Sequence, residues 1–75
     1  MKFRLPEITK KENSAVITCW HVKEKEHVRA DQDIVEVSTD KATFDIAAPC
    51  NGILNKIIKK EGEDARIGEI IAEIE

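Results

Sequence analysis

The sequence predicts a single small all-β domain, folded as an antiparallel sandwich or barrel. Val and Ile account for 16 of the 31 hydrophobic residues, and β-branched side chains favour strands over helices. Short apolar segments alternate with turn signals along the chain, as in antiparallel β folds. The length of 75 residues allows one domain, residues 1–75, and the 41% hydrophobic content suffices for a small core.

The first half of the chain is expected to begin with an edge strand. Residues 2–5 alternate polar and apolar side chains, and Pro6 ends the strand because it cannot donate to a ladder. Residues 9–14 are polar and predict a surface loop, and residues 15–22 are rich in β-formers and predict a long strand. A charged connection over 23–27 is followed by Val28 as an isolated apolar anchor and by a polar turn over 30–33.

The middle of the chain predicts a hairpin. Strands are expected at 34–37 and 42–47, because both segments carry apolar β-formers, and the polar segment 38–41 between them predicts a tight turn. A second turn is expected at 49–52, where Asn51 and Gly52 are suited to positive φ.

The last third is expected to contain two further strands, at 53–58 and 70–74. Gly62 and Gly68 indicate turns on either side of residues 65–67. A helix over 55–65 is an alternative, but Gly62 interrupts it and its apolar residues do not recur at helical spacing.

An internal repeat relates the two halves. A shift of 37 residues aligns 23–37 with 60–74, and charged residues match at 23, 24, 26, 29 and 36. The apolar pairs 28/65, 34/71 and 37/74 coincide as well, which makes chance similarity in a Glu/Lys-rich chain the weaker explanation. We expect two similar halves packed face to face about an approximate two-fold axis. The repeat places the 38–41 turn at the midpoint of the chain, with Lys41 exposed at a rigid hairpin tip.

Composition argues against several functional classes. The longest apolar run is three residues, so we expect neither a membrane span nor a secretory signal. Net charge is −3 with interleaved signs, which is not typical of a nucleic-acid binder. Two cysteines are too few for a disulfide scaffold and are expected to be reduced. A chain this short rarely forms a deep catalytic cleft, so a carrier or binding module is favoured over an enzyme.

One motif makes the prediction specific. Residues 36–42 read Glu-Val-Ser-Thr-Asp-Lys-Ala, and Ala48-Pro49 precedes Gly52 by the spacing Ala-Pro-x-x-Gly. Together with residues 5–8, 20–24, 60–63 and 72–75, these segments resemble the lipoyl domain of the acyltransferase component of 2-oxo acid dehydrogenase complexes, within the biotinyl/lipoyl carrier family. The resemblance covers nearly the whole chain, and several motifs occur in order at matching spacings.

The resemblance implies a flattened β-barrel of two four-stranded antiparallel sheets with pseudo-two-fold symmetry. It also implies that Lys41 carries lipoate through an amide bond, and that Asp40 and Ala42 are read by the lipoate-attaching enzyme, although Asp40 also suits a turn on its own. The lipoyl-lysine would act as a swinging arm between a thiamine-dependent 2-oxo acid decarboxylase, the acyltransferase and dihydrolipoyl dehydrogenase.

The resemblance further implies a setting for the chain. We expect a monomeric carrier domain of a longer acyltransferase, with no catalytic residues of its own. It would lie in a bacterial cytoplasm or, in a eukaryote, in the mitochondrial matrix. A biotin carrier domain is an alternative, but biotin carriers typically have Met on both sides of the modified lysine. An unmodified interaction module of the same fold is the second alternative.

Two departures from the family pattern stand out. Lys25 and Asp31 occupy positions where the family usually has glycine, whereas their counterparts in the repeat are Gly62 and Gly68. If those positions need positive φ, Lys25 and Asp31 strain or reshape their turns. The loop 9–14 also lacks the Gly/Glu-rich sequence common in the family, where it lies near the lipoyl-lysine and helps the decarboxylase recognise its carrier.

The remaining chemistry-bearing residues predict no further site. Cys19, His21, His27 and Cys50 lack the spacing of a metal site, and no metal is expected. Cys19 is expected to be buried and Cys50 to be exposed in its turn. Trp20 is expected in the core rather than as a partner anchor.

Overall fold

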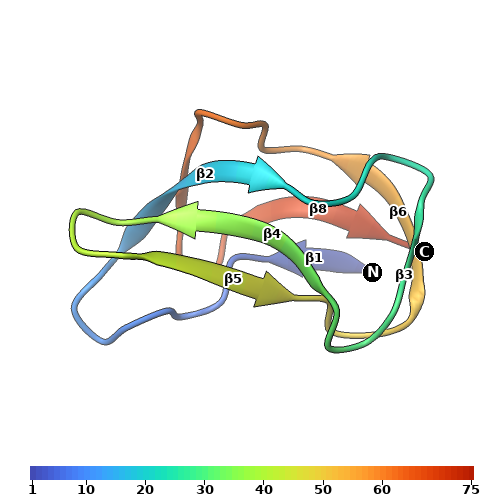
Figure 1. The fold of residues 1–75 in the computed structure, drawn as a ribbon, viewed down its shortest axis with the longest axis horizontal. Coiled ribbons are helices and arrows are strands. Elements are labelled where there is room, and N and C mark those ends of the chain that lie inside the picture. Colours follow the sequence, from blue (N-terminus) through green and yellow to red (C-terminus); the bar gives the residue numbers. More distant parts are fainter.

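The computed structural model describes residues 1–75 as two four-stranded antiparallel sheets, which confirms the predicted fold class (Figure 1). In strand order the first sheet comprises β1 (Lys2–Arg4), β8 (Ile70–Ile74), β6 (Gly52–Ile57) and β3 (His27–Val28). The second sheet comprises β5 (Thr43–Ala47), β4 (Asp33–Ser38), β2 (Ser14–Trp20) and β7 (Asp64–Arg66). The barrel is flattened and elongated, with extents of 31 × 20 × 17 Å. No helix of the structure could span a membrane.

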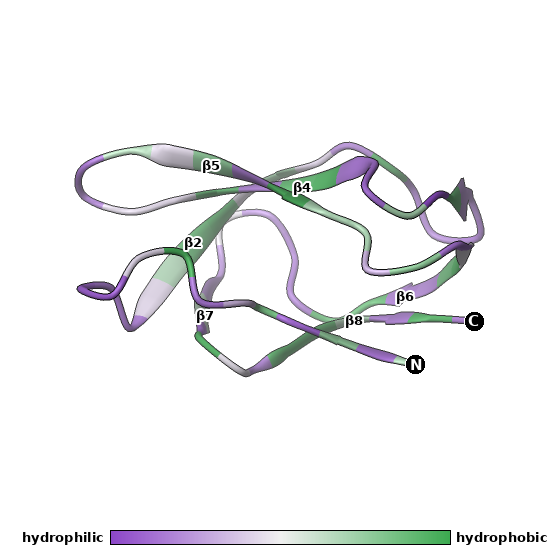
Figure 2. Cartoon of the chain, turned by 90° about the horizontal axis from the view of Figure 1, so that it is seen from below, coloured by the Kyte–Doolittle hydropathy of each residue, from purple (hydrophilic) through white to green (hydrophobic).

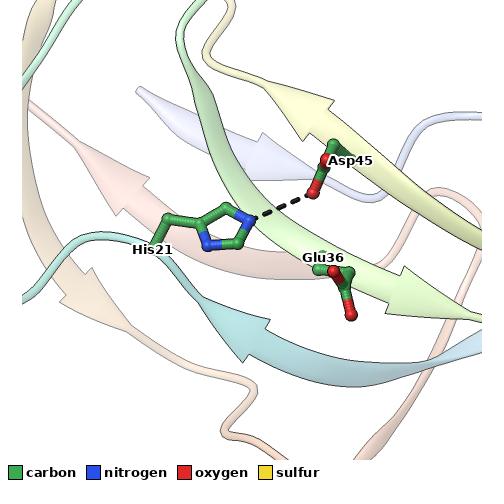
Figure 3. A group of neighbouring side chains, drawn as sticks. All are labelled: His21, Glu36 and Asp45. Atoms are coloured by element: carbon green, nitrogen blue, oxygen red, sulfur yellow. Dashed lines mark hydrogen bonds and ion pairs between the residues drawn. The ribbon is translucent and has the colours of Figure 1, made fainter.

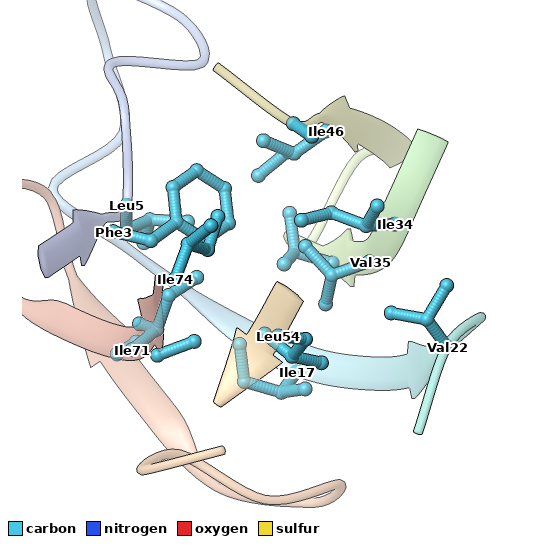
Figure 4. Close-up of a cluster of buried hydrophobic side chains, with 14 of the residues drawn as sticks. Phe3, Leu5, Ile17, Val22, Ile34, Val35, Ile46, Leu54, Ile71 and Ile74 are labelled. Carbon is cyan, nitrogen blue, oxygen red and sulfur yellow. The ribbon is translucent and has the colours of Figure 1, made fainter. Parts of the chain in front are cut away.

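The core lies between the two sheets and is built from aliphatic side chains of both halves (Figure 4). Ile17 on β2 and Leu54 on β6 are fully buried and occupy equivalent positions of the repeat. In Figure 2 the connections at the two ends of the barrel include hydrophilic stretches, whereas hydrophobic stretches run along β2, β4 and β5. Along each strand, apolar side chains that point inward alternate with polar side chains that point outward, and this alternation determines which face of the strand is buried.

The internal repeat is confirmed as a structural pseudo-two-fold. A shift of 37 residues maps β2 onto β6, β3 onto β7 and β4 onto β8. The turns repeat in atomic detail: Lys23 N donates to Glu26 Oε1 at 2.8 Å, and Lys60 N donates to Glu63 Oε1 at 2.7 Å. The symmetry extends further than the sequence shows, because β1 and β5 are both edge strands that pair with the equivalent strands β8 and β4.

The two turn positions that lack the family's glycine nevertheless adopt the left-handed backbone conformation. Lys25 and Asp31 adopt φ values of 76° and 70°, and their counterparts Gly62 and Gly68 adopt 90° and 87°. The first half thus keeps the turn conformation of the second half without its glycines. A left-handed backbone brings Cβ close to the following carbonyl oxygen, so these two residues are strained.

The sequence did not predict two of the eight strands. β3 pairs with β6 through His27 and Val28, and β7 pairs with β2 over Asp64–Arg66. Each contains one inward apolar residue, Val28 or Ala65, which is too short a pattern to reveal a strand. β2 also ends at Trp20, two residues earlier than predicted, and no helix forms over 55–65.

The expectation of positive φ at Asn51 or Gly52 is wrong. Neither residue is among those with positive φ, and Gly52 begins β6 instead. Glycine is needed at position 52 because there is no room for a side chain. A Cβ there would collide with Glu75 O and would lie 2.8 Å from Ile74 Cγ2. Gly52 is therefore required by the close approach of the end of β8 to β6.

Candidate functional site

The β4–β5 hairpin forms one end of the molecule, and the two chain termini lie at the other end (Figure 1). Its strands pair in continuous register near the tip, with Ser38 opposite Thr43 and Val37 opposite Phe44. Val37 is fully buried, and Ile46 is 8% exposed further down the hairpin. The tip is consequently held by a cross-strand ladder whose inner side chains are fixed in the core.

Thr39 closes the turn at the tip. Its backbone N–H donates to Ala42 O at 2.9 Å. Its hydroxyl donates to the same carbonyl at 3.4 Å and accepts from Lys41 N at 3.3 Å. The hydroxyl thereby links Thr39 to Lys41 and to Ala42 across the loop, as expected of a threonine-supported turn.

The three residues singled out from the motif lie together at this tip. Asp40, Lys41 and Ala42 are all exposed. The Lys41 side chain makes no hydrogen bond within the chain, and only the backbone N–H of this residue is bonded. It makes no ion pair either, since the two ion pairs of the domain join His21 with Asp45 and Lys59 with Glu69. The amine therefore projects from a rigid support with nothing in the domain competing for it.

The loop 9–14 lies beside this tip. A shallow groove between them is lined by Glu12, Asp40 and Asp64, with serine and threonine side chains between the acids. The loop is anchored at its end by the bond from Ile67 N to Asn13 O, at 2.9 Å. A protein that approaches Lys41 would therefore meet an acidic groove built from three separate segments.

The second half of the motif has a structural role far from Lys41. Ala48 is buried, accepts a hydrogen bond from Asp31 N at 3.0 Å and donates to Gln32 O at 2.8 Å. Asn51 Oδ1 accepts from Ala30 N at 2.8 Å. The Ala-Pro-x-x-Gly segment thus secures the end of the barrel that carries the termini, and it does not contribute to the tip.

The structure does not gather the four residues first considered for a metal. Cys50 is half-buried, with its Sγ 3.5 Å from Met1 Sδ, and Cys19 is half-buried on β2. His21 instead lies beside Glu36 and Asp45 on the outer face of the second sheet (Figure 3). Sequence reasoning missed these two acids, because only the register of β4 and β5 brings them to His21.

Trp20 is not fully in the core as expected. It is half-buried, packs against the core and donates from Nε1 to Lys59 O at 2.9 Å. Burial raises the pKa of the neighbouring Cys19 thiol, and the negative charges of Glu61, Glu36 and Asp45 raise it further. A raised pKa disfavours the thiolate, which is the nucleophilic form of cysteine.

Known proteins resemble this chain along its whole length. A family model described as "Biotin-requiring enzyme" matches residues 1–74. The dihydrolipoyllysine-residue succinyltransferase component of the 2-oxoglutarate dehydrogenase complex of Buchnera aphidicola is 37% identical over 70 residues, which is 93% of this chain and 18% of that protein.

The succinyltransferase component of the same name from Rickettsia conorii is 36% identical over 74 residues, covering 99% of this chain and 19% of that protein. The chain therefore spans about a fifth of the length of these relatives. The solution structure of the lipoyl domain of the 2-oxoglutarate dehydrogenase complex from Azotobacter vinelandii superposes with a TM-score of 0.78 at 27% identity, covering 100% of this chain and 95% of that one.

Proposed function

The chain belongs to the biotin–lipoyl family, and we propose that it is a lipoyl carrier domain in which Lys41 bears lipoate. The observation that carries this proposal is the position of Lys41. Its unpaired, exposed amine stands at the tip of the β4–β5 hairpin, at the opposite end of the molecule from the termini. A longer chain attached at either terminus would leave this end free for partners.

The residues around Lys41 fit an amide-linked lipoyl group. An attaching enzyme needs a free amine that it can approach from several sides, and the neighbours Asp40 and Ala42 are exposed and short. When attached, lipoate supplies a disulfide that accepts an acyl group together with two electrons. Asp40 and Ala42 in place of two methionines favour lipoate over biotin.

The rest of the domain contributes rigidity and position. The buried face of the hairpin and the Thr39 hydroxyl fix the backbone on both sides of Lys41. A fixed attachment point confines the reacting end of the long acyl-lysine to a shell around the tip. Tethering then maintains a high local concentration of the carried group at each partner's active site.

We further propose that residues 1–75 form one carrier unit of an acyltransferase component. Its partners would be a thiamine-dependent 2-oxo acid decarboxylase and dihydrolipoyl dehydrogenase. The names of the Buchnera and Rickettsia relatives support 2-oxoglutarate as the substrate of that complex. The acidic groove beside Lys41, lined by Glu12, Asp40 and Asp64, is the surface on which the decarboxylase would distinguish this carrier from others.

Intact-mass analysis after enzymatic attachment tests the modification. The domain is incubated with lipoate, ATP and a lipoate ligase, and in parallel with biotin, ATP and a biotin ligase. We expect the mass of one lipoyl group in the first reaction and no change in the second. Lys41→Arg should abolish the gain, whereas Lys25→Arg, at another exposed turn lysine, should leave it unchanged.

Three results would contradict the proposal. Modification of Lys41→Arg would place the group on another of the nine lysines. Efficient biotinylation would assign the domain to the biotin carriers. No gain from either ligase, while a known lipoyl domain gains mass in the same reaction, would identify an unmodified module of this fold.

A further inference from the structure

Three potential metal ligands converge on the outer face of the second sheet, away from the hairpin tip. His21 follows β2, Glu36 lies on β4 and Asp45 lies on β5 (Figure 3). One ligand atom from each lies within 4.8 Å of the others, and His21 Nε2 is 3.0 Å from Asp45 Oδ1. The three side chains are exposed or half-buried, so an ion can reach them from solvent.

The register of the strands makes this convergence fixed rather than incidental. Glu36 is the direct cross-strand partner of Asp45, and Cys19 is the direct partner of Glu36 on the other side. The backbone N–H of His21 donates to Ile34 O at 2.9 Å, which holds the histidine beside β4. Three backbone segments that are firmly hydrogen-bonded to one another therefore supply the three side chains.

The charges at this position are not balanced within the protein. Two carboxylates directly opposite each other on neighbouring strands repel, and such pairs destabilise a sheet. No Lys or Arg forms an ion pair with either acid, and the only countercharge in contact is His21 when it is protonated.

We propose that His21, Glu36 and Asp45 form a binding site for a divalent transition-metal cation of the zinc class. Zinc binds imidazole nitrogen and carboxylate oxygen at about 2.0–2.2 Å, which requires ligand atoms roughly 3.3–3.6 Å apart in a tetrahedral site. His21 Nε2 and Asp45 Oδ1 are 3.0 Å apart, and no two of the three ligand atoms are more than 4.8 Å apart, so rotation of the side chains would suffice to close the site.

The donor set also selects the kind of metal. Imidazole suits zinc, nickel, cobalt and copper, whereas magnesium and calcium prefer all-oxygen ligands. Three protein ligands leave a coordination position open for water. A bound cation would neutralise the carboxylate pair and would join β5, β4 and the end of β2, the elements that support the hairpin. This site departs from the sequence expectation that no metal is bound, and it is independent of lipoate attachment.

Calorimetric titration of the untagged, unmodified 75-residue chain with zinc chloride tests the site. We expect saturable binding of one zinc ion that excess calcium does not displace. His21→Gln and Asp45→Asn should each weaken binding at least tenfold. The matched controls His27→Gln and Asp33→Asn change an exposed histidine and an exposed β4 acid elsewhere, and should bind as the wild type does.

Cysteine thiolates also bind zinc, so the titration is repeated on a Cys19→Ser, Cys50→Ser chain. Retained binding in that chain supports the site, and binding that disappears with the thiols overturns it. No saturable binding in the wild type would overturn it as well. Circular dichroism of every variant confirms the fold, and Glu36→Gln provides an independent ligand substitution should His21→Gln or Asp45→Asn fail to fold.

Discussion

Alanine and glycine substitutions at Lys25 isolate the cost of the left-handed backbone at this turn. Lys25 has φ of 76°, and its ammonium donates to Asn55 Oδ1 at 2.7 Å. Both Lys25→Ala and Lys25→Gly remove that hydrogen bond. The difference between the two variants therefore reports on the backbone alone.

The expected magnitude follows from two opposing terms. A Cβ in the left-handed region costs about 1–2 kcal/mol. Glycine avoids this cost, but its greater conformational freedom in the unfolded chain destabilises the folded state by about 0.5–1 kcal/mol. Lys25→Gly should accordingly be more stable than Lys25→Ala by about 0.5–1 kcal/mol, which raises Tm by about 2–8 °C for a domain of this size.

Urea unfolding followed by circular dichroism measures the difference, and two positions serve as controls. At Lys23, in the same connection but without positive φ, the order should reverse, with glycine less stable than alanine. At Gly62, φ is 90° and an added Cβ meets no atom within 4 Å, so Gly62→Ala should cost about 0.5–1 kcal/mol through the backbone alone. Equal stability of Lys25→Ala and Lys25→Gly would show that the left-handed backbone imposes no net cost at this turn.

Three further predictions concern the charged turn and the tip. Glu69 accepts from Arg66 N and from Lys59, which lowers its pKa, so it stabilises the fold above the ordinary glutamate range and loses that contribution on acidification. Glu69→Gln should be less stable than wild type in urea at pH 7, and the difference should shrink steadily as the pH falls below the ordinary glutamate range. Thr39→Val should slow lipoylation by up to about fivefold, the equivalent of about 1 kcal/mol of lost hydroxyl bonds, and Thr39→Ser should restore it in a mass-spectrometric time course. Grafting a Gly/Glu-rich loop over 9–14 should change the rate of reductive acylation by the decarboxylase while leaving lipoylation unchanged, and equal acylation rates would contradict this role of the loop.

Much of the fold follows from local pattern and repetition. The strand predicted at 70–74 is observed with those bounds, and the hairpin around Lys41 lies where two apolar segments flank a polar turn. The turns indicated by Gly62 and Gly68 are observed, and both glycines adopt positive φ there. These features depend on residues close together in the chain, so the sequence alone specifies them.

Features that depend on pairing between distant segments could not be predicted. β3 exists because β6 pairs with it, not because two residues carry a strand pattern. Gly52 is needed by the backbone at Glu75, which no local signal at 51–52 reveals. Glu36 and Asp45 meet only through the register of the hairpin. The lysine motif was readable because its residues are contiguous.

Reductive acylation of the lipoylated domain tests the carrier function most directly. The modified domain is mixed with 2-oxoglutarate and its thiamine-dependent decarboxylase, and its intact mass is followed in parallel with the same reaction on pyruvate and its own decarboxylase. The predicted result is the mass of one succinyl group plus one hydrogen atom on the lipoylated domain, no gain on the Lys41→Arg variant, and a much slower reaction with pyruvate. A lipoylated domain that accepts no acyl group from either decarboxylase would contradict its assignment as an acyl carrier.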